Sequence, residues 1–527
     1  MTSVSVDLPV VMAGVALYEH IRRNLDPSGR LPAEVGLPDD AKVMSDRLRW
    51  VPGAMDGVIG HHGSADGTDR ATEVARLLAT ACQRPSARQL RKLYAGITDD
   101  DVMDYVDALM ERLGRERLDG RALHRVGKWL AVTAPDRGPV KLGIALLGVT
   151  GLGDDVAVVR TLGAHEEFTL FCAVAISNGL PAPESELWAL AASVDGWGRI
   201  HCVERLRDTT DPDIRSWILR EGFRNSIMYE YLACIAATTG GLLEALRGET
   251  VDRGLLTSAG EILEALITGG PAEDVDDYES GADAVEAFLA TMTTQAQTLQ
   301  DFSTVATIRS FLARETGWDQ RSQNGWTATR RQAFEHASDQ ILSQDSWIGR
   351  ITAGLASDDP VEFSLADRAA RVRGMDTFDA HLEKIKTDPF GSGWYHAWQQ
   401  ADTGRAQQLA DLAHTLLPID QITTGPADEL GMGPQWRAHN ALDWTLQALR
   451  DHPGTGADLL LAGLHSPVTR NRNMALTAFQ QWPRTAWPAD AHDVIHDLAR
   501  SDPNDNARRF ALELTTGQVE EDEQHDR

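Results

Sequence analysis

The stretch Glu166-Glu-Phe-Thr-Leu-Phe-Cys-Ala-Val-Ala-Ile176 is the first of three similar segments, and it decides how the chain is read. Each segment contains a cysteine in an apolar run, and Cys172, Cys202 and Cys234 lie 30 and 32 residues apart. A further short segment with helical spacing precedes each copy, at 156–162, 185–193 and 214–221. Three consecutive helix pairs at one period predict a solenoid, because one pair cannot bury its apolar face alone and stacks on its neighbours.

A turn separates the two helices of each predicted pair at a comparable place, with Gly163, Asp195-Gly196 and Gly222 as the turn residues. Elsewhere, glycine, proline and polar clusters interrupt segments whose apolar residues have helical spacing, and no convincing strand is present. Helices are expected, for example, at 10–23, 68–82 and 120–132, and residues 274–280 are expected to begin another. The predicted fold class is therefore all-α.

The C-terminal part repeats the same style. Residues 459–479 read as helix, turn and helix, and Asp502-Pro-Asn-Asp-Asn-Ala-Arg-Arg-Phe-Ala-Leu resembles the turn and second helix of HEAT repeats. The resemblance implies a HEAT-like α-solenoid of stacked helix pairs with an N-terminal helical domain. The expected domains are an N-terminal helical domain (1–135), a first repeat block (136–272), connecting helices (273–335), a second repeat block (336–515) and a disordered acidic tail (516–527).

Charge and composition exclude several classes of protein. The chain has 527 residues, and 78 acidic against 50 basic side chains give a net charge of −28. Without a clustered basic face, neither nucleic acid nor an anionic membrane is an expected partner. No apolar run long enough to span a bilayer and no signal peptide are recognisable, so a cytoplasmic location is expected. The four cysteines lack metal-knuckle spacing and are expected to be reduced and buried.

The second helices of neighbouring pairs bring several chemically interesting side chains into adjacent rows. If the protein is an enzyme, the candidate catalytic residues are Glu166, Glu167, His201, Glu204 and Glu230, with His201 and Glu204 as metal ligands. The alternative is that these residues form core contacts and salt bridges. The candidate partner-binding residues are Trp197, Arg199, Tyr229, Tyr231, Trp394 and Trp398, although core packing is the favoured interpretation of the last two.

Motifs of known catalytic sites are missing. There is no phosphate-binding loop, no His-Glu-x-x-His and no Gly-x-Ser-x-Gly, and a di-iron site would need two Glu-x-x-His pairs. A metal site at His61-His62 with Asp56 and Asp66 is weighed against an ordinary polar loop. No cofactor and no metal are expected.

Residues 146–239, with Leu162-Gly-Ala-His-Glu-Glu-Phe-Thr-Leu and Gly196-Trp-Gly-Arg-Ile-His-Cys-Val-Glu-Arg-Leu, resemble a bacterial family often catalogued as limonene hydroxylase. The resemblance implies a monoterpene monooxygenase, for which the family provides no catalytic residues to transfer.

The repeats, the missing catalytic motifs and this resemblance leave two hypotheses for the function. The first is a non-enzymatic HEAT-like scaffold that binds a protein or peptide partner on its concave surface. The alternative is a limonene hydroxylase-like monooxygenase with a site in the solenoid groove.

Overall fold

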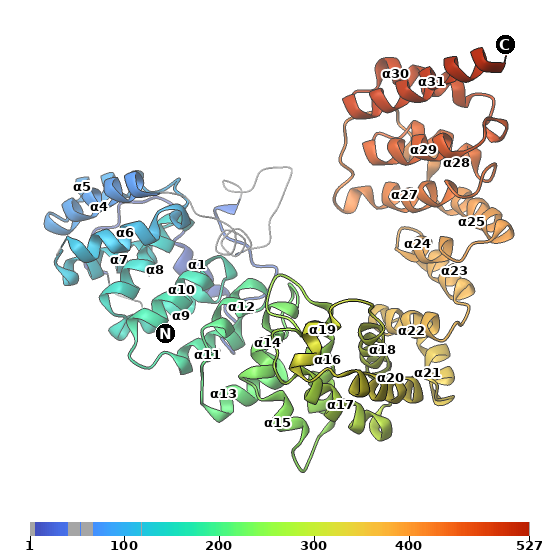
Figure 1. Cartoon of the computed structure of the whole chain (residues 1–527). Helices are drawn as coiled ribbons and strands as arrows, with labels where there is room; N and C mark the ends of the chain where they lie inside the picture. Colours follow the sequence, from blue (N-terminus) through green and yellow to red (C-terminus); the bar gives the residue numbers. More distant parts are fainter. Residues whose placement is uncertain (1–5, 41–52, 54–66, 117, 526–527) are drawn as a thin grey trace. The chain divides into compact units, whose positions relative to one another are not determined.

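The structure is a computed structural model that describes residues 6–40, 53, 67–116 and 118–525. Every regular element in these residues is a helix (Figure 1), and the one extended pairing among them is a single bridge between Glu429 and Val468. The all-α prediction is therefore confirmed. The chain divides into two compact units, residues 1–342 and 343–527, and each is described by itself.

The first unit is built mainly from short helices. Its elements are α1 (Leu17–Asn24), α4 (Thr68–Gln83), α5 (Ala87–Ala95), η1 (Val102–Asp104), α6 (Val106–Arg115), α7 (Gly120–Thr133), α8 (Arg137–Thr150), η2 (Gly153–Asp155), α9 (Val156–Gly163), α10 (Glu166–Gly179), α11 (Glu184–Ser193), α12 (Gly196–Glu204), α13 (Pro212–Trp217), η3 (Ile218–Gly222), α14 (Glu230–Thr238), α15 (Leu242–Leu246), α16 (Arg253–Thr268), α17 (Gly281–Gln295), α18 (Leu299–Leu312), α19 (Trp318–Arg321), η4 (Ser322–Asn324) and α20 (Ala328–Leu342).

Alternate helices of the first unit contact one another in chain order. Helix α8 packs against α10, α10 against α12, α12 against α14, and the succession continues through α16 and α18 to α20. Side-chain caps fix where several of these helices begin: the imidazole of His165 accepts a hydrogen bond from the Glu167 backbone, and Thr298 and Asp301 form a capping box at α18. Cys172, Cys202 and Cys234 are buried in this unit with free thiols, whereas Cys82 is only partly buried.

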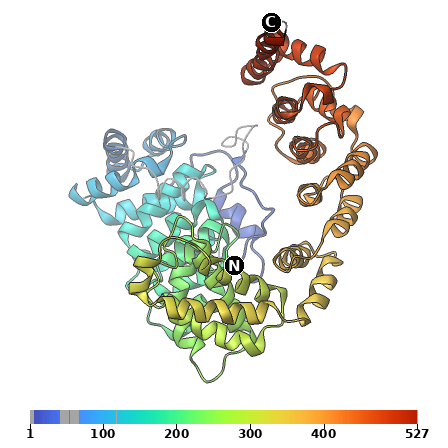
Figure 2. The same cartoon turned by 45° about the vertical axis from the view of Figure 1, so that its right-hand side comes forward.

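The second unit continues the pattern of short helices, coloured from yellow-orange to red in Figure 2. Its elements are α21 (Ser346–Leu355), α22 (Pro360–Val372), α23 (Phe378–Thr387), α24 (Gly393–Trp398), α25 (Thr403–Leu416), α26 (Ile419–Ile422), η5 (Pro434–Trp436), α27 (Arg437–Leu449), α28 (Ala457–Leu464), α29 (Thr469–Gln481), η6 (Arg484–Ala486), α30 (Ala491–Ser501) and α31 (Asp505–His525).

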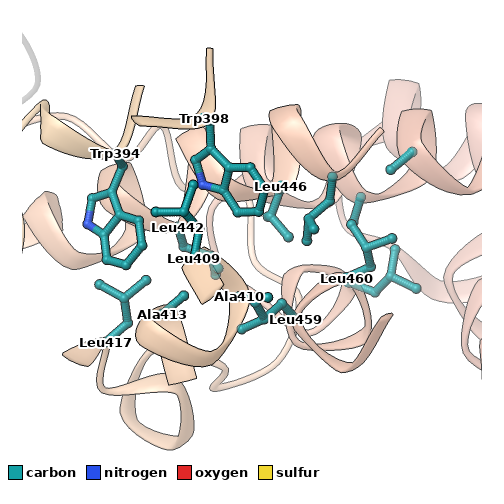
Figure 3. Packing of buried hydrophobic residues seen from close by; sticks show 14 of the residues in the cluster. Trp394, Trp398, Leu409, Ala410, Ala413, Leu417, Leu442, Leu446, Leu459 and Leu460 are labelled. Atoms are coloured by element: carbon teal, nitrogen blue, oxygen red, sulfur yellow. The ribbon is translucent and has the colours of Figure 1, made fainter. Parts of the chain in front are cut away.

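One hydrophobic core runs through most of the second unit. Helix α24 contacts α27, α27 contacts α29, and α29 contacts α31. Figure 3 shows Trp394 and Trp398 of α24 facing the leucines of α25, α27 and α28 inside this core. Burial of two indole rings and the surrounding aliphatic side chains supplies much of the hydrophobic stabilisation of this unit.

Three further expectations from the sequence concern the C-terminal tail, the domain boundaries and membrane-spanning segments. Helix α31 continues to His525, so it extends into residues 516–527, which were expected to be disordered. The stretch lacks proline and is rich in glutamate and glutamine, which are good helix formers. The domain boundaries at 135, 272 and 335 remain predictions. Within the described part of the chain, no helix combines the length and apolarity needed to span a membrane.

Candidate functional site

The turns of three successive helix pairs line one pocket of the first unit, with a volume of about 680 Å³. The walls come from the turn between α9 and α10 (164–166), the turn between α11 and α12 (193–195), and residues 224–226 with Tyr229 before α14. The N-terminal segment around Arg30 to Val35 closes another side, and Arg199 also lines the pocket. Turns that repeat in the sequence are therefore gathered around one cavity.

Glu166 places its carboxylate against the first turn of α12. Its Oε1 accepts a hydrogen bond from the backbone N–H of Asp195 at 3.2 Å, and Oε2 accepts one from Gly198 at 3.5 Å. Burial raises the pKa of Glu166 to about 7, and the neighbouring charge of Asp195 adds to the rise, although the backbone hydrogen bonds oppose it. Glu166 therefore changes its protonation state near neutral pH, inside a pocket.

Gly196 explains how the Glu166 carboxylate comes so close to the backbone. Its φ is +46°, in the left-handed region that glycine adopts without a steric penalty. A Cβ at this position would lie 2.6 Å from Oε2 of Glu166. The turn residue that marked the repeat in the sequence thus has a direct structural role in the pocket.

Hydrogen bonds hold the turns of the pocket together. The Asp195 carboxylate accepts a hydrogen bond from the backbone N–H of Ser226 at 2.9 Å. The guanidinium of Arg199 donates to the carbonyls of Val194 and Arg224, at 2.8 and 2.7 Å. Arg30 donates to the carbonyl of Ala192 at 2.6 Å, which attaches the N-terminal segment to the same turns. The pocket walls are therefore braced by polar contacts between different turns.

Glu167 faces a different environment from its neighbour Glu166. Its carboxylate lies 2.8 Å from Nζ of Lys141 and 3.3 Å from the guanidinium of Arg137. Burial alone would raise the pKa of Glu167, but the two cations lower it below its ordinary value. The geometry matches the salt-bridge alternative considered for this residue.

His201 and Glu204 lie close together on α12, but they do not line the pocket. Nδ1 of His201 is 3.7 Å from a carboxylate oxygen of Glu204, and the His201 ring stacks on Trp197 with centroids 6.1 Å apart. Trp197 also contacts Tyr231 at 5.1 Å between ring centroids. Trp197 and His201 are both buried, so they form an aromatic packing cluster beside α14.

The predicted residues are therefore divided among several places. Glu166, Arg199 and Tyr229 line the pocket, whereas Glu230 begins α14 next to Gly270. Trp394 and Trp398 are 0% and 5% exposed, so the structure places them in the core and not on a binding surface. Their apolar surroundings on α25 and α27 account for this burial. His61, His62, Asp56 and Asp66 lie outside the described residues.

The predicted acidic and histidine residues do not gather into a set of metal ligands. Within the ranges that the structure describes, the one group of three or more His, Cys, Asp or Glu with ligand atoms within 4.8 Å of one another is Asp367, His381 and His396. Sequence reasoning missed this group, since its members come from three separate helices with no recognised metal-ligand spacing. It also missed Arg30 and Asn225 of the pocket, which only the folded chain brings to the repeated turns.

Comparison with known proteins provides no family assignment. No family model matches the chain, and neither a curated protein nor a solved structure matches it.

Proposed function

We propose that the chain is a non-enzymatic HEAT-like helical-repeat scaffold that binds a basic peptide segment of a protein partner. The observation that carries the proposal is the pocket lined by the turns of three successive helix pairs. Solenoids bind partners through surfaces built from corresponding positions of neighbouring repeats. The chain-order packing from α8 to α20 supports a solenoid of stacked pairs.

The polar groups of the pocket favour a cationic side chain of the partner. Two of the backbone hydrogen bonds that Glu166 accepts are long, at 3.2 and 3.5 Å, and a carboxylate has about four acceptor sites, so Glu166 retains capacity to accept from a lysine or arginine. Three arginines also line the pocket, and each already has partners within this chain: Arg30 and Arg199 donate to carbonyls, and Arg224 pairs with Glu261. A net charge of −28 also speeds the approach of a basic partner.

The placement of the pocket specifies where such a partner contacts the scaffold. The peptide would lie along the turns at the edge of the helix pairs, with Arg199 and Tyr229 among the residues it touches. An irregular segment of this chain, around Arg30 to Val35, already contacts the same turns. This contact supports the proposal that the turns bind a polypeptide without regular secondary structure.

Binding to arrayed peptides that vary in charge, followed by fluorescence polarisation with the best ligands, tests the proposal. We expect basic peptides to bind and Glu166→Gln to weaken them about 10–100-fold, the loss typical of a hydrogen bond to a charged group. Tyr229→Ala should weaken binding as well. Glu244→Gln removes a carboxylate whose side chain is 85% exposed and is the matched control. Equal binding by wild type and Glu166→Gln would contradict the proposal.

The second candidate is a limonene hydroxylase-like monooxygenase, which rests on the resemblance of residues 146–239. One observation favours an enzyme: a carboxyl with a pKa of about 7 in a pocket is suited to general acid–base catalysis. Oxygen activation, however, requires haem, flavin, copper or non-haem iron, and the predicted residues of α10, α12 and α14 do not converge as ligands.

Product analysis distinguishes the second candidate from the first. Purified protein supplied with reductant, oxygen and a monoterpene should form a hydroxylated product that Glu166→Gln abolishes. Product formation unaffected by this variant would place the chemistry away from the pocket.

A further inference from the structure

Three side chains from successive helices of the second unit converge on one point. Asp367 lies on α22, His381 on α23 and His396 on α24. One carboxylate oxygen and one nitrogen of each imidazole lie within 4.8 Å of one another. None of the three residues lines the pocket described above, and metal binding by them does not depend on the proposed peptide binding.

The Asp367 carboxylate is held in place by its neighbours. Oδ1 accepts hydrogen bonds from the hydroxyl of Thr377 at 3.1 Å and from Nε2 of His381 at 2.8 Å. Thr377 is itself fixed by Gln400, whose amide nitrogen donates to the threonine hydroxyl at 2.7 Å. Oδ2 contacts the guanidinium of Arg371 at 3.0 Å. Such orientation by surrounding hydrogen bonds is typical of the residues around metal ligands.

The two imidazoles have nitrogen atoms that no hydrogen bond satisfies. Among the described residues, Nδ1 of His381 and Nδ1 of His396 are buried and lack a partner. His381 is 1% exposed, so water cannot readily compensate for the missing hydrogen bond. Leaving a buried polar atom unsatisfied costs about 1–3 kcal/mol. A bound cation would satisfy Nδ1 of His396, since neutral imidazole offers a lone pair to metals, whereas Nδ1 of His381 gains no partner where Nε2 of that ring is the ligand.

The relative position of the rings also suits shared coordination. The rings of His381 and His396 are nearly parallel, at 21°, with centroids 5.0 Å apart, and Phe363 covers the His381 ring edge-on at 5.3 Å. Ligand atoms of a tetrahedral zinc site with bonds of about 2.0–2.1 Å lie about 3.3 Å apart. Nε2 of His381 and Oδ1 of Asp367 are 2.8 Å apart, and the ligand atoms of all three residues lie within 4.8 Å of one another, so a shift of about 1.5 Å or less at the partly buried His396 would complete the set.

We propose that Asp367, His381 and His396 form a binding site for a divalent transition-metal ion, with Zn²⁺ as the probe. Two imidazoles and one carboxylate suit Zn²⁺ or Fe²⁺, whereas Mg²⁺ and Ca²⁺ prefer oxygen ligands alone. The three ligands leave coordination positions open. Because the site joins α22, α23 and α24, an ion there stabilises the second unit as well as binding to it.

Zinc titration of the full-length protein, with excess Mg²⁺ present to occupy the exposed acidic groups, tests the site. We expect one Zn²⁺ per chain, and a rise in the unfolding temperature that EDTA reverses. His396→Gln removes the partly buried ligand and should weaken binding more than 10-fold. His414→Gln is the matched control, because His414 pairs with Asp458 at 2.7 Å and does not belong to the group of Asp367, His381 and His396.

X-ray absorption of the zinc-loaded wild type decides the question independently of any variant's folding. Scattering from two imidazoles at about 2.0–2.1 Å supports the site. Absence of zinc binding above that of Mg²⁺, zinc binding unchanged in His396→Gln, or a spectrum with oxygen ligands only would each overturn it.

Discussion

Arg472 of α29 and Asp502, which follows α30, form a two-point ion pair in which neither side chain is exposed to solvent. Nε and one terminal nitrogen of Arg472 donate to the two carboxylate oxygens at 2.7 and 2.8 Å. The same guanidinium donates to the carbonyls of Ala427, Ser466 and Pro467. One arginine thus satisfies polar groups from three segments of the second unit, one of them the Asp502-Pro turn that follows α30.

Replacing Arg472 with methionine should destabilise the second unit strongly. The change leaves the buried Asp502 carboxylate and several carbonyls without their donor, and loss of one partner of a buried pair typically costs about 3–5 kcal/mol. Chemical denaturation and hydrogen exchange in α29 measure the effect. The control is Arg437→Met, which removes an exposed pair with Asp388 and should cost less than about 1 kcal/mol. Equal losses of unfolding free energy in Arg472→Met and Arg437→Met would contradict the conclusion that burial makes the Arg472–Asp502 pair important.

Helical periodicity is a local signal, and for that reason the sequence predicted several helices closely. The expected helices at 68–82 and 120–132 correspond to α4 (Thr68–Gln83) and α7 (Gly120–Thr133). Two expected helix starts were wrong because local backbone chemistry overrides the pattern. Gly14 has a φ of +125°, and α1 begins only at Leu17. Asp274 accepts a hydrogen bond from the Asp276 backbone in a turn, and α17 begins at Gly281.

The site was only partly predictable, since residue type does not determine exposure or distant contacts. The repeat register brought Glu166, Arg199 and Tyr229 into consideration, and these residues do line the pocket. Arg30 comes from a distant segment that no repeat marks. The sequence favoured a core position for Trp394 without excluding a surface position, and packing on α25 and α27 buries it.

Glu166→Gln should change how stability depends on pH. Because the folded pKa of about 7 exceeds the usual value of 4.5, the folded state holds a proton that the unfolded chain releases. The resulting stability is fully present below pH 4.5 and is lost as the pH rises toward and through 7. The glutamine variant lacks this titration, so the difference in unfolding free energy between wild type and variant should vary with pH across this window. A pH-independent difference would show that Glu166 is not the titrating group.

Glu167→Gln should destabilise the first unit because the charged form of Glu167 is the stabilising one, whereas burial disfavours the charged form of Glu166. The Glu167 and Lys141 side chains are 13% and 7% exposed, so the variant leaves the lysine ammonium buried without its closest anion. We expect a loss on the order of 3 kcal/mol at neutral pH. Since the pKa of Glu167 is lowered, its contribution is present above the usual carboxyl pKa and disappears as the pH falls through the lowered value.

A double variant separates charge pairing from other effects of changing Glu167. Lys141→Met combined with Glu167→Gln removes both members of the pair, so part of the lost stability should return. Thermal unfolding of the four proteins in the cycle measures the coupling. Additive losses from the two substitutions would mean that the pair contributes nothing specific.

Gly196→Ala should disturb both the turn and the carboxylate that contacts it. The left-handed backbone costs a residue with a Cβ about 1–2 kcal/mol, and the new methyl group would lie 2.6 Å from Oε2 of Glu166. Combining the variant with Glu166→Ala removes the clash but not the backbone strain, so the double variant should recover only part of the loss. Gly114→Ala is the control, because nothing lies within 4 Å of its added Cβ on α6 and alanine favours a helix by up to about 1 kcal/mol. Calorimetric unfolding of these variants separates backbone strain from the clash with Glu166. An equal loss of stability in Gly196→Ala and in the double variant would mean that the Glu166 carboxylate does not depend on the glycine at position 196.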